Sequence, residues 1–216
     1  MTIKLFCITK DTKYRIINIL GIKLRFRSKY RAYNTYLQIG PKNYYLCVVL
    51  DWASREVLGW SLSDNMNTQL CLEALDMAFS TGRKPEIFNT DQGSQYTSHD
   101  WLRELEERGI SISMDGKGRW ADNIAVERFW RTYKHDSFLL NEVNTLEEAR
   151  LLTAHGLAYY NRERPHARLS NLRPSEYCRQ TGYPPAAIFW SDFSAPARIA
   201  ALGTHRLRYE VAPKMD

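Results

Sequence analysis

Tyr44-Tyr-Leu-Cys-Val-Val-Leu50 decides the fold class of this 216-residue chain. The run is almost wholly apolar, which is typical of a central strand that is buried on both faces. Turn-forming residues follow at 51–54, and residues 55–62 predict a strand that returns antiparallel to the first. Before the run, residues 35–39 predict a short strand that a Gly-Pro-Lys-Asn turn connects to it. The region therefore predicts three consecutive strands of one sheet.

The rest of the core alternates helical and strand patterns. Apolar residues at helical spacing, capping residues before them and glycines after them mark the helices. The predicted elements are a helix that begins at Asn67 or Thr68 and ends by Gly82, a strand at 86–91, a helix from Ser98 to Arg108, an edge strand at 110–114, a helix from Asp122 or Asn123 to about His135, and a helix from Thr145 to Tyr160. This order predicts an α/β domain with a mixed sheet flanked by helices.

The composition indicates a folded chain with a basic N-terminal part. Its hydrophobic content of 44% excludes global disorder, and no apolar run approaches the roughly 20 residues that a membrane helix needs. Residues 1–43 contain ten Lys and Arg residues but only one acid, Asp11. On charge alone, such a run fits a nucleic-acid partner and a solvated segment about equally well. The four cysteines are far apart and lack metal-binding spacing, which predicts reduced thiols in the cytoplasm.

Two carboxylates stand out by their positions. Asp91 ends a predicted strand, where ligands tend to bind in α/β sheets. Glu127 lies about one turn into the helix predicted over 122–135 and shares a face with Arg131 and Lys134, opposite the apolar residues. Mg²⁺ accepts one or two such carboxylates together with phosphate oxygens of a substrate. Taken singly, each acid is explained better by a turn or by a surface ion pair.

The motifs around Asp91 and Glu127 make this pair of acids a specific signal of function. Thr90-Asp-Gln-Gly-Ser-Gln-Tyr96 and Asp122-Asn-Ile-Ala-Val-Glu127 leave 35 residues between the two acids. Motifs that agree with this spacing are Tyr45-Leu-Cys-Val-Val-Leu-Asp51, Ser54-Arg55, Gly59-Trp60, Ser113-Met-Asp-Gly-Lys-Gly-Arg-Trp-Ala-Asp-Asn123 and Tyr160-Asn-Arg-Glu-Arg-Pro-His166. Over residues 35–177 the chain resembles the catalytic core of insertion-sequence transposases related to retroviral integrase.

The resemblance implies an RNase-H-like fold with a mixed five-stranded sheet. It also implies that Asp91 and Glu127 are catalytic ligands of two Mg²⁺ or Mn²⁺ ions, and that the protein cleaves and transfers DNA strands. Lys134 is implied to contact the end of the DNA, and the other residues expected to bind DNA are Lys117, Arg119 and Arg131. The expected partners are DNA and either further copies of this chain or a full-length transposase, with no membrane. The expected location is the cytoplasm, on the nucleoid when DNA is bound.

The first acid of the family pattern is absent. Aligned without a gap, Tyr33 takes its position, and with a gap of one residue Asn34 does. A phenol, with a pKa of about 10, is neutral at pH 7, and an amide brings no charge. Two-metal phosphoryl transfer needs an anionic oxygen between the ions. We therefore expect a weakened metal site and little or no strand transfer. The alternative hypothesis is a non-catalytic DNA-binding or inhibitory partner of a full-length transposase.

Four other acids are candidates to replace the missing one. Asp51 fits a turn-forming role better than a ligand role, and Asp122 fits a helix cap. Asp115 flanks the glycine-rich loop that precedes the helix of Glu127, and Asp11 lies in the divergent N-terminal part.

The chain divides into three predicted segments. Residues 1–32 form a basic, divergent N-terminal segment, residues 33–178 form the core-like domain, and residues 179–216 form a C-terminal extension without a predicted structure. Relatives in the family carry a helical DNA-recognition region before the core. Because only a basic segment takes its place here, we expect recognition of DNA ends to require another polypeptide.

Overall fold

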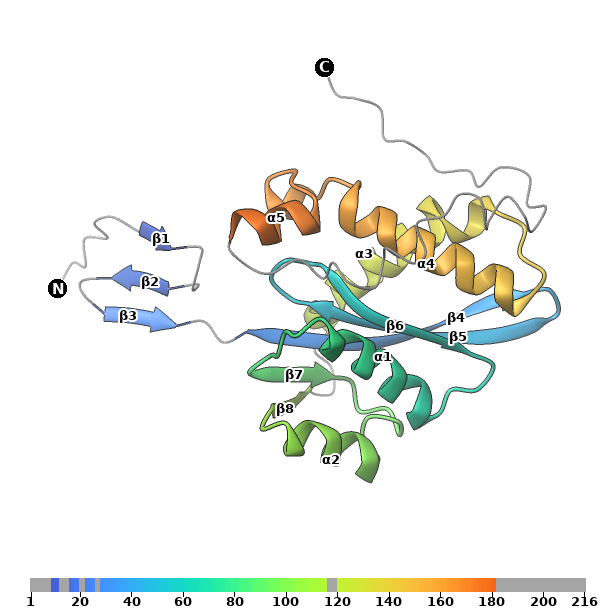
Figure 1. The fold of residues 1–216 in the computed structure, drawn as a ribbon, viewed down its shortest axis with the longest axis horizontal. Helices are drawn as coiled ribbons and strands as arrows, with labels where there is room; N and C mark the ends of the chain where they lie inside the picture. Colours follow the sequence, from blue (N-terminus) through green and yellow to red (C-terminus); the bar gives the residue numbers. More distant parts are fainter. Residues whose placement is uncertain (1–8, 12–15, 20–21, 26–27, 116–119, 182–216) are drawn as a thin grey trace, which may run out of the picture.

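The main sheet has five strands and is covered by helices on both faces (Figure 1). A computed structural model describes residues 9–11, 16–19, 22–25, 28–115 and 120–181. The strand order is β6-β5-β4-β7-β8, with bounds β4 Lys29–Ile39, β5 Lys42–Asp51, β6 Val57–Ser63, β7 Ile87–Thr90 and β8 Ser111–Met114. β4, β5 and β6 are antiparallel, whereas β7 and β8 run parallel to β4. The mixed five-stranded sheet predicted from the sequence is confirmed.

The helices form two layers, one on each face of this sheet. Their bounds are α1 Thr68–Ser80, α2 His99–Glu107, α3 Trp120–Asp136, α4 Leu146–Arg162 and α5 Pro174–Gln180, with short 3-10 turns at Phe138–Leu140 and Ala167–Leu169. In Figure 1, α1 and α2 lie on one side of the sheet and α3, α4 and α5 on the other. Among the helices that the structure describes, none has the length and apolar character needed to cross a membrane.

Strand β4 contributes to both layers because its side chains alternate between the two faces. Tyr30 and Ala32 are buried with residues of α1 and α2, whereas Leu37 and Ile39 are buried with residues of α3 and α4. Its pairing with β5 continues without interruption from Tyr30 to Ile39. The odd-numbered residues of β4, which include Arg31 and Tyr33, therefore face α3 and α4.

Helix α1 packs unusually close to β6 at Gly59. A Cβ atom at this position would lie 2.2 Å from the carbonyl oxygen of Ala74 and 2.6 Å from the backbone nitrogen of Ala78. The helix begins as predicted, since the side chain of Asn67 accepts a hydrogen bond of 3.0 Å from the backbone N–H of Leu70. A glycine is required at position 59 because any side chain there would push the helix off the sheet.

Helix α4 is fixed at both of its ends. The predicted capping box is present, with reciprocal hydrogen bonds between Thr145 and Glu148. At the other end, the buried side chain of Asn161 accepts a hydrogen bond from the N–H of Val57 at 2.9 Å and donates one to its carbonyl oxygen at 2.8 Å. Asn161 thus pairs with β6 as a strand residue would, which gives a structural role to part of the 160–166 motif.

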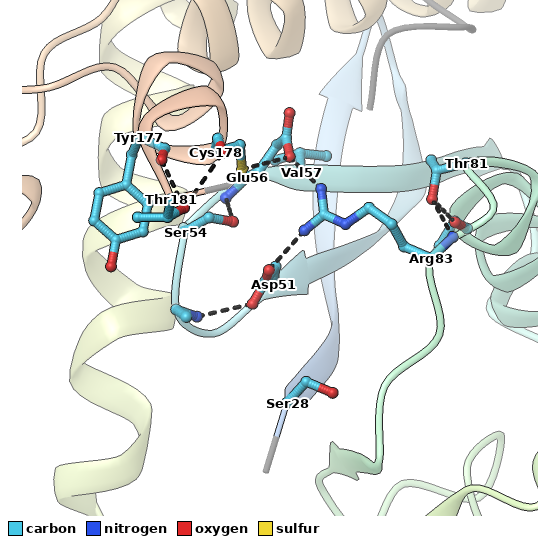
Figure 2. Close-up of polar contacts among 12 residues, drawn as sticks. Ser28, Asp51, Ser54, Glu56, Val57, Thr81, Arg83, Tyr177, Cys178 and Thr181 are labelled. Atoms are coloured by element: carbon cyan, nitrogen blue, oxygen red, sulfur yellow. Dashed lines mark hydrogen bonds and ion pairs between the residues drawn. The ribbon is translucent and has the colours of Figure 1, made fainter. Parts of the chain in front are cut away.

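A buried ion network connects the β5–β6 turn with the segment after α1 (Figure 2). Arg83 donates to Oδ2 of Asp51 at 2.6 Å and also pairs with Glu56. The Sγ of Cys178 in α5 donates to the same Glu56 oxygen at 3.1 Å. Burial alone would lower the pKa of Arg83, but Tyr30 and the two carboxylates raise it above its usual value. Asp51 also closes the turn by accepting from the N–H of Ala53, which agrees with the turn-forming role expected of it.

The cysteines in the described part of the chain are free thiols. Cys47 in β5, Cys71 in α1 and Cys178 in α5 are all fully buried. Cys7 lies outside the described residues.

The N-terminal part contains strands that the sequence did not predict. β1 Thr9–Asp11, β2 Ile16–Ile19 and β3 Ile22–Arg25 pair as a three-stranded antiparallel sheet. In addition, β4 begins at Lys29, six residues before the strand expected at 35–39. Short strands with mixed Lys, Arg and Ile residues show no clear period, so the pattern did not separate them from loop.

His166 makes the stability of the fold depend on pH. Its ring packs edge-on against Tyr160, with centroids 4.6 Å apart. Burial and the neighbouring Arg164 lower the pKa of His166 to about 4. The unfolded chain, with a histidine pKa of about 6.5, therefore binds more protons than the folded one between pH 6.5 and 4. We expect the free energy of unfolding to fall by about 3 kcal/mol when the pH is lowered from 7 to 4.

Urea unfolding at several pH values measures this effect. In His166→Gln, the loss of stability between pH 7 and 4 should be smaller than in the wild type, whereas His99→Gln, which changes an exposed histidine, should leave the slope unchanged. If the free energy of unfolding depended on pH equally in all three proteins, the role given to His166 would be contradicted.

Candidate functional site

Three neighbouring strands present a row of residues to the face that α3 covers. Arg31, Asn89 and Ser113 lie in register across β4, β7 and β8. Because side chains alternate along a strand, residues two positions later lie on the same face. The residues two positions after Arg31, Asn89 and Ser113 are Tyr33, Asp91 and Asp115, and they form a second row on this face. β7 and β8 end just before Asp91 and Asp115, so this second row lies at the carboxyl ends of parallel strands, where ligands bind in open sheets.

Tyr33 occupies this row without contributing a negative charge. Its side chain is buried, and its hydroxyl oxygen accepts a hydrogen bond of 2.9 Å from Nη1 of Arg31. Burial raises the pKa of Tyr33 to about 12, although the Arg31 guanidinium acts in the opposite direction. The phenol is therefore neutral at pH 7, as expected from the ordinary pKa of tyrosine.

Asn34 lies on the opposite face. Its Oδ1 accepts a hydrogen bond of 3.0 Å from the hydroxyl of Tyr96, and its Nδ2 lies 3.6 Å from Sγ of Cys71. These partners belong to the layer formed by α1 and the segment before α2. Of the two positions that the sequence left open for the missing acid, Tyr33 is the one on the face of Arg31 and Asp115.

Asp91 is exposed, and the turn that follows orients it. Its Oδ1 accepts a hydrogen bond of 2.8 Å from the N–H of Gly93, an Asx turn. A Cβ atom at Gly93 would lie 2.9 Å from this same oxygen and 2.5 Å from Nε2 of Gln95. The glycine in the 90–96 motif thus leaves room for the carboxylate and for the Gln95 side chain.

Helix α3 has the amphipathic character that the sequence predicted. Phe129 and Tyr133 are buried against the sheet, and the two rings stack with centroids 6.5 Å apart. Glu127 and Arg131 are exposed on the helix. Glu127 is therefore carried by the helix that covers the same face of the sheet to which Tyr33 points.

Of the four predicted DNA-binding residues, Arg131 and Lys134 lie in the described part of the chain, both on α3. Lys134 in α3 is half-buried, and its Nζ lies 5.0 Å from the ring centroid of Tyr36, an exposed tyrosine on β4. Burial lowers the pKa of Lys134. Lys117 and Arg119 lie outside the described residues.

The acids are not assembled into a closed ligand set. Within residues 28–115 and 120–181, no group of three or more His, Cys, Asp or Glu side chains is placed to hold a metal ion. Mg²⁺ is commonly bound by one or two carboxylates, with phosphate oxygens and water completing the shell. The described residues therefore offer separate carboxylates at the row and on α3, and not a preformed cage.

Arg31 is the residue at this site that sequence reasoning missed. It belongs to the basic N-terminal run of the sequence, yet it is only 2% exposed. Its guanidinium contacts Tyr33, lies 3.5 Å from Oδ1 of Asp115 and stands 4.1 Å from the ring centroid of Trp52. The guanidinium of Arg55 lies at the same distance from that ring. The alternation of β4 would have placed Arg31 beside Tyr33 had the strand been extended to Lys29.

Comparison with known proteins identifies the family. A family model described as "Integrase core domain" matches residues 18–119, and a second with the same description matches residues 108–174. The chain has an integrase core domain over residues 18–174. The RNase-H-like fold that the sequence resemblance implied for this integrase core is confirmed by its structural neighbours.

The relatives of this integrase core include proteins of insertion sequences. The putative transposase InsK of IS150 from Escherichia coli K12 is 34% identical over 152 residues, which cover 69% of this chain and 54% of the relative. Transposase InsF of IS3A from the same organism is 35% identical over 146 residues, which cover 66% and 51%. The chain spans about half the length of the curated relatives it matches.

Solved integrase structures share the fold at low sequence identity. The catalytic core domain of BIV integrase superposes with a TM-score of 0.57 at 15% identity, covering 71% of this chain and 95% of that one. The HTLV-2 integrase catalytic core domain in complex with magnesium has a TM-score of 0.51 at 18% identity, covering 70% and 94%. At this level of identity, the likeness concerns the fold.

Proposed function

We propose that this integrase core is a DNA-binding protein of the insertion-sequence transposase type with little or no capacity to cleave and transfer DNA strands. The observation that carries the proposal is the neutral, buried phenol of Tyr33 in the row that ends in Asp91 and Asp115. The transposase names of the relatives support the DNA-directed role. Oligomerisation, with itself or with a longer transposase, belongs to the same proposal.

The carboxylates of this chain fit one divalent cation better than two. Asp91 and Glu127 are exposed acids that would hold Mg²⁺ or Mn²⁺ on this face, and the magnesium in the HTLV-2 structure is consistent with that choice. When bound, such an ion stabilises negative charge on a phosphate and activates water. At the position of Tyr33 the chain offers a phenol hydrogen-bonded to a guanidinium, which does not fit a second ion. Strand transfer, which relies on two ions, should therefore be lost.

DNA binding has separate support on α3. Arg131 and Lys134 lie on the helix of Glu127, and the exposed ring of Tyr36 lies beside Lys134. A cationic side chain next to an aromatic face is suited to a nucleic-acid backbone and its bases. The basic residues before β4, together with Lys117 and Arg119, would add salt-dependent, sequence-independent affinity.

A strand-transfer assay tests the proposal. Oligonucleotides carrying the terminal repeats of the DNA that flanks the reading frame are incubated with the protein, Mn²⁺ and a plasmid target. We expect no more joined product from the wild type than from Glu127→Gln, because the wild type already lacks one anion. Both proteins should bind the same DNA with an affinity that falls as salt rises, which shows that they are competent to bind. Joined product well above the Glu127→Gln level would contradict the proposed inactivity.

A further inference from the structure

Two buried oxygen atoms on the α3 face of β7 and β8 have no hydrogen-bond partner among the described residues. They are Oδ1 of Asn89 and Oδ2 of Asp115. Asn89 is only 2% exposed, and its Nδ2 donates to the carbonyl oxygen and to Oγ of Ser113, at 3.1 and 3.2 Å. These bonds fix the amide and leave its oxygen as an unused acceptor. Buried acceptors are nearly always paired in native proteins, so these two oxygens in adjacent rows of one face leave acceptor capacity for a further donor or a cation beside the guanidinium of Arg31.

Asp115 and Asp91 are immediate neighbours at the end of the paired strands. The N–H of Asp115 donates to the carbonyl oxygen of Thr90 at 2.9 Å, which continues the β7–β8 pairing by one step. Nε2 of Gln92 donates to the carbonyl oxygen of Asp115 at 3.3 Å. The side chain of Asp115 is 13% exposed, so it is held near the protein interior while Asp91 is open to solvent.

The positive charge of Arg31 balances only one side of this carboxylate. Its Nη2 lies 3.5 Å from Oδ1 of Asp115, which is longer than a normal charged hydrogen bond, and the second carboxylate oxygen is the one without a partner. Arg31 thus partly neutralises the side of Oδ1 and leaves ligand capacity on the side of Oδ2.

We propose that Asp115 supplies the carboxylate that β4 lacks, so that Asp115 and Oδ1 of Asn89 complete, on the β8 side of Asp91, the site of the single divalent cation that Asp91 and Glu127 would hold. This inference rests on the proposed function, in which Asp91 is a ligand. Carboxylate and amide oxygens are the ligands that Mg²⁺ and Mn²⁺ prefer. In this arrangement the additional carboxylate, Asp115, lies on the β8 side of Asp91 and not on its β4 side. The chain therefore binds one ion but cannot bind a second beside Tyr33.

Binding of Mn²⁺ alone tests this site without any assay of activity. Electron paramagnetic resonance of the full chain should count one bound Mn²⁺ per protein. In Asp115→Asn, the dissociation constant should rise by roughly tenfold or more, since even residues that only orient a ligand change metal affinity by 10- to 100-fold. The matched control is Asp100→Asn, which removes an exposed acid paired with Arg103 and should bind Mn²⁺ as the wild type does. Melting temperatures establish that each variant is folded.

A second variant moves the affinity in the opposite direction. In Arg31→Gln, removal of the guanidinium beside Asp115 should tighten Mn²⁺ binding several-fold, because a competing cation is lost. Unchanged or weaker binding in this variant would contradict the placement of the ion beside Asp115. Wild-type affinity in Asp115→Asn, or no bound Mn²⁺ in the wild type, would overturn the inference and leave the proposed inactivity standing. Strand-transfer products from the wild type would overturn the inactivity instead.

Discussion

Tyr33→Asp is expected to create a second Mn²⁺ site and to raise DNA strand transfer by about 100-fold or more. The position faces α3 in the row of Asp91, so a carboxylate there would lie between the two ions that the chemistry needs. A bridging anion contributes several kcal/mol to the stability of the transition state, and every 1.36 kcal/mol corresponds to about a factor of ten in rate. Strand transfer on terminal-repeat DNA and Mn²⁺ stoichiometry measure the two effects.

Arg31 will oppose part of this gain. Its guanidinium faces position 33, where Nη1 lies 2.9 Å from the Tyr33 hydroxyl, so it would attract a carboxylate introduced there and compete with the ions. Tyr33→Asp combined with Arg31→Gln should therefore be more active than Tyr33→Asp alone.

Asn34→Asp is the matched control for this experiment. It adds the same carboxylate one residue later, but on the opposite face, next to Tyr96 and Cys71. We expect no additional Mn²⁺ and no strand transfer, together with a loss of stability because a charge is placed among buried groups. If Asn34→Asp restored metal binding and Tyr33→Asp did not, the assignment of the missing acid would be wrong.

Arg83→Met should lower the free energy of unfolding by about 3–5 kcal/mol, because it leaves the carboxylates of Asp51 and Glu56 buried without their common cation. Both acids are at most 2% exposed, so water cannot replace the guanidinium. Urea denaturation at pH 7 measures the change.

Two further variants separate charge from packing in this network. Arg103→Met removes an exposed arginine of α2 and should change stability by less than about 0.5 kcal/mol. Adding Glu56→Gln to Arg83→Met should recover part of the loss, because one of the two uncompensated charges is neutralised. A loss below about 1 kcal/mol for Arg83→Met would indicate that the network contributes little to stability.

The sequence predicted the elements that carry strong local patterns. The apolar run 44–50 lies within β5, the polar cap at Asn67 begins α1, and the capping box at Thr145 begins α4. The face of α3 that packs on the sheet followed from helical spacing alone, since Phe129 and Tyr133 are buried and Glu127 is exposed. Each of these features is decided by residues within a few positions of one another.

Features that depend on pairing between residues far apart in the sequence could not be predicted from local patterns. The register that aligns Arg31 with Asn89 and Ser113 joins strands that are far apart in the chain. This register helps to decide that Tyr33, and not Asn34, occupies the position of the missing acid. The side-chain bonds of Asn161 to Val57 span 104 residues. Arg31 carries a charge, so composition grouped it with the basic N-terminal run, whereas pairing buried it between a phenol and an aspartate.

The burial of three free thiols has a practical consequence. Cys47, Cys71 and Cys178 lie in a central strand, in the helix on one face and in the short helix on the other. A maleimide reaches each of them only when the covering layer opens, so the rate of alkylation at each position measures a different opening event. With Cys7 replaced by serine, Cys178 reports detachment of the small C-terminal helix, and the other two report opening of the main layers. The chain thus carries chemical probes of its own local unfolding.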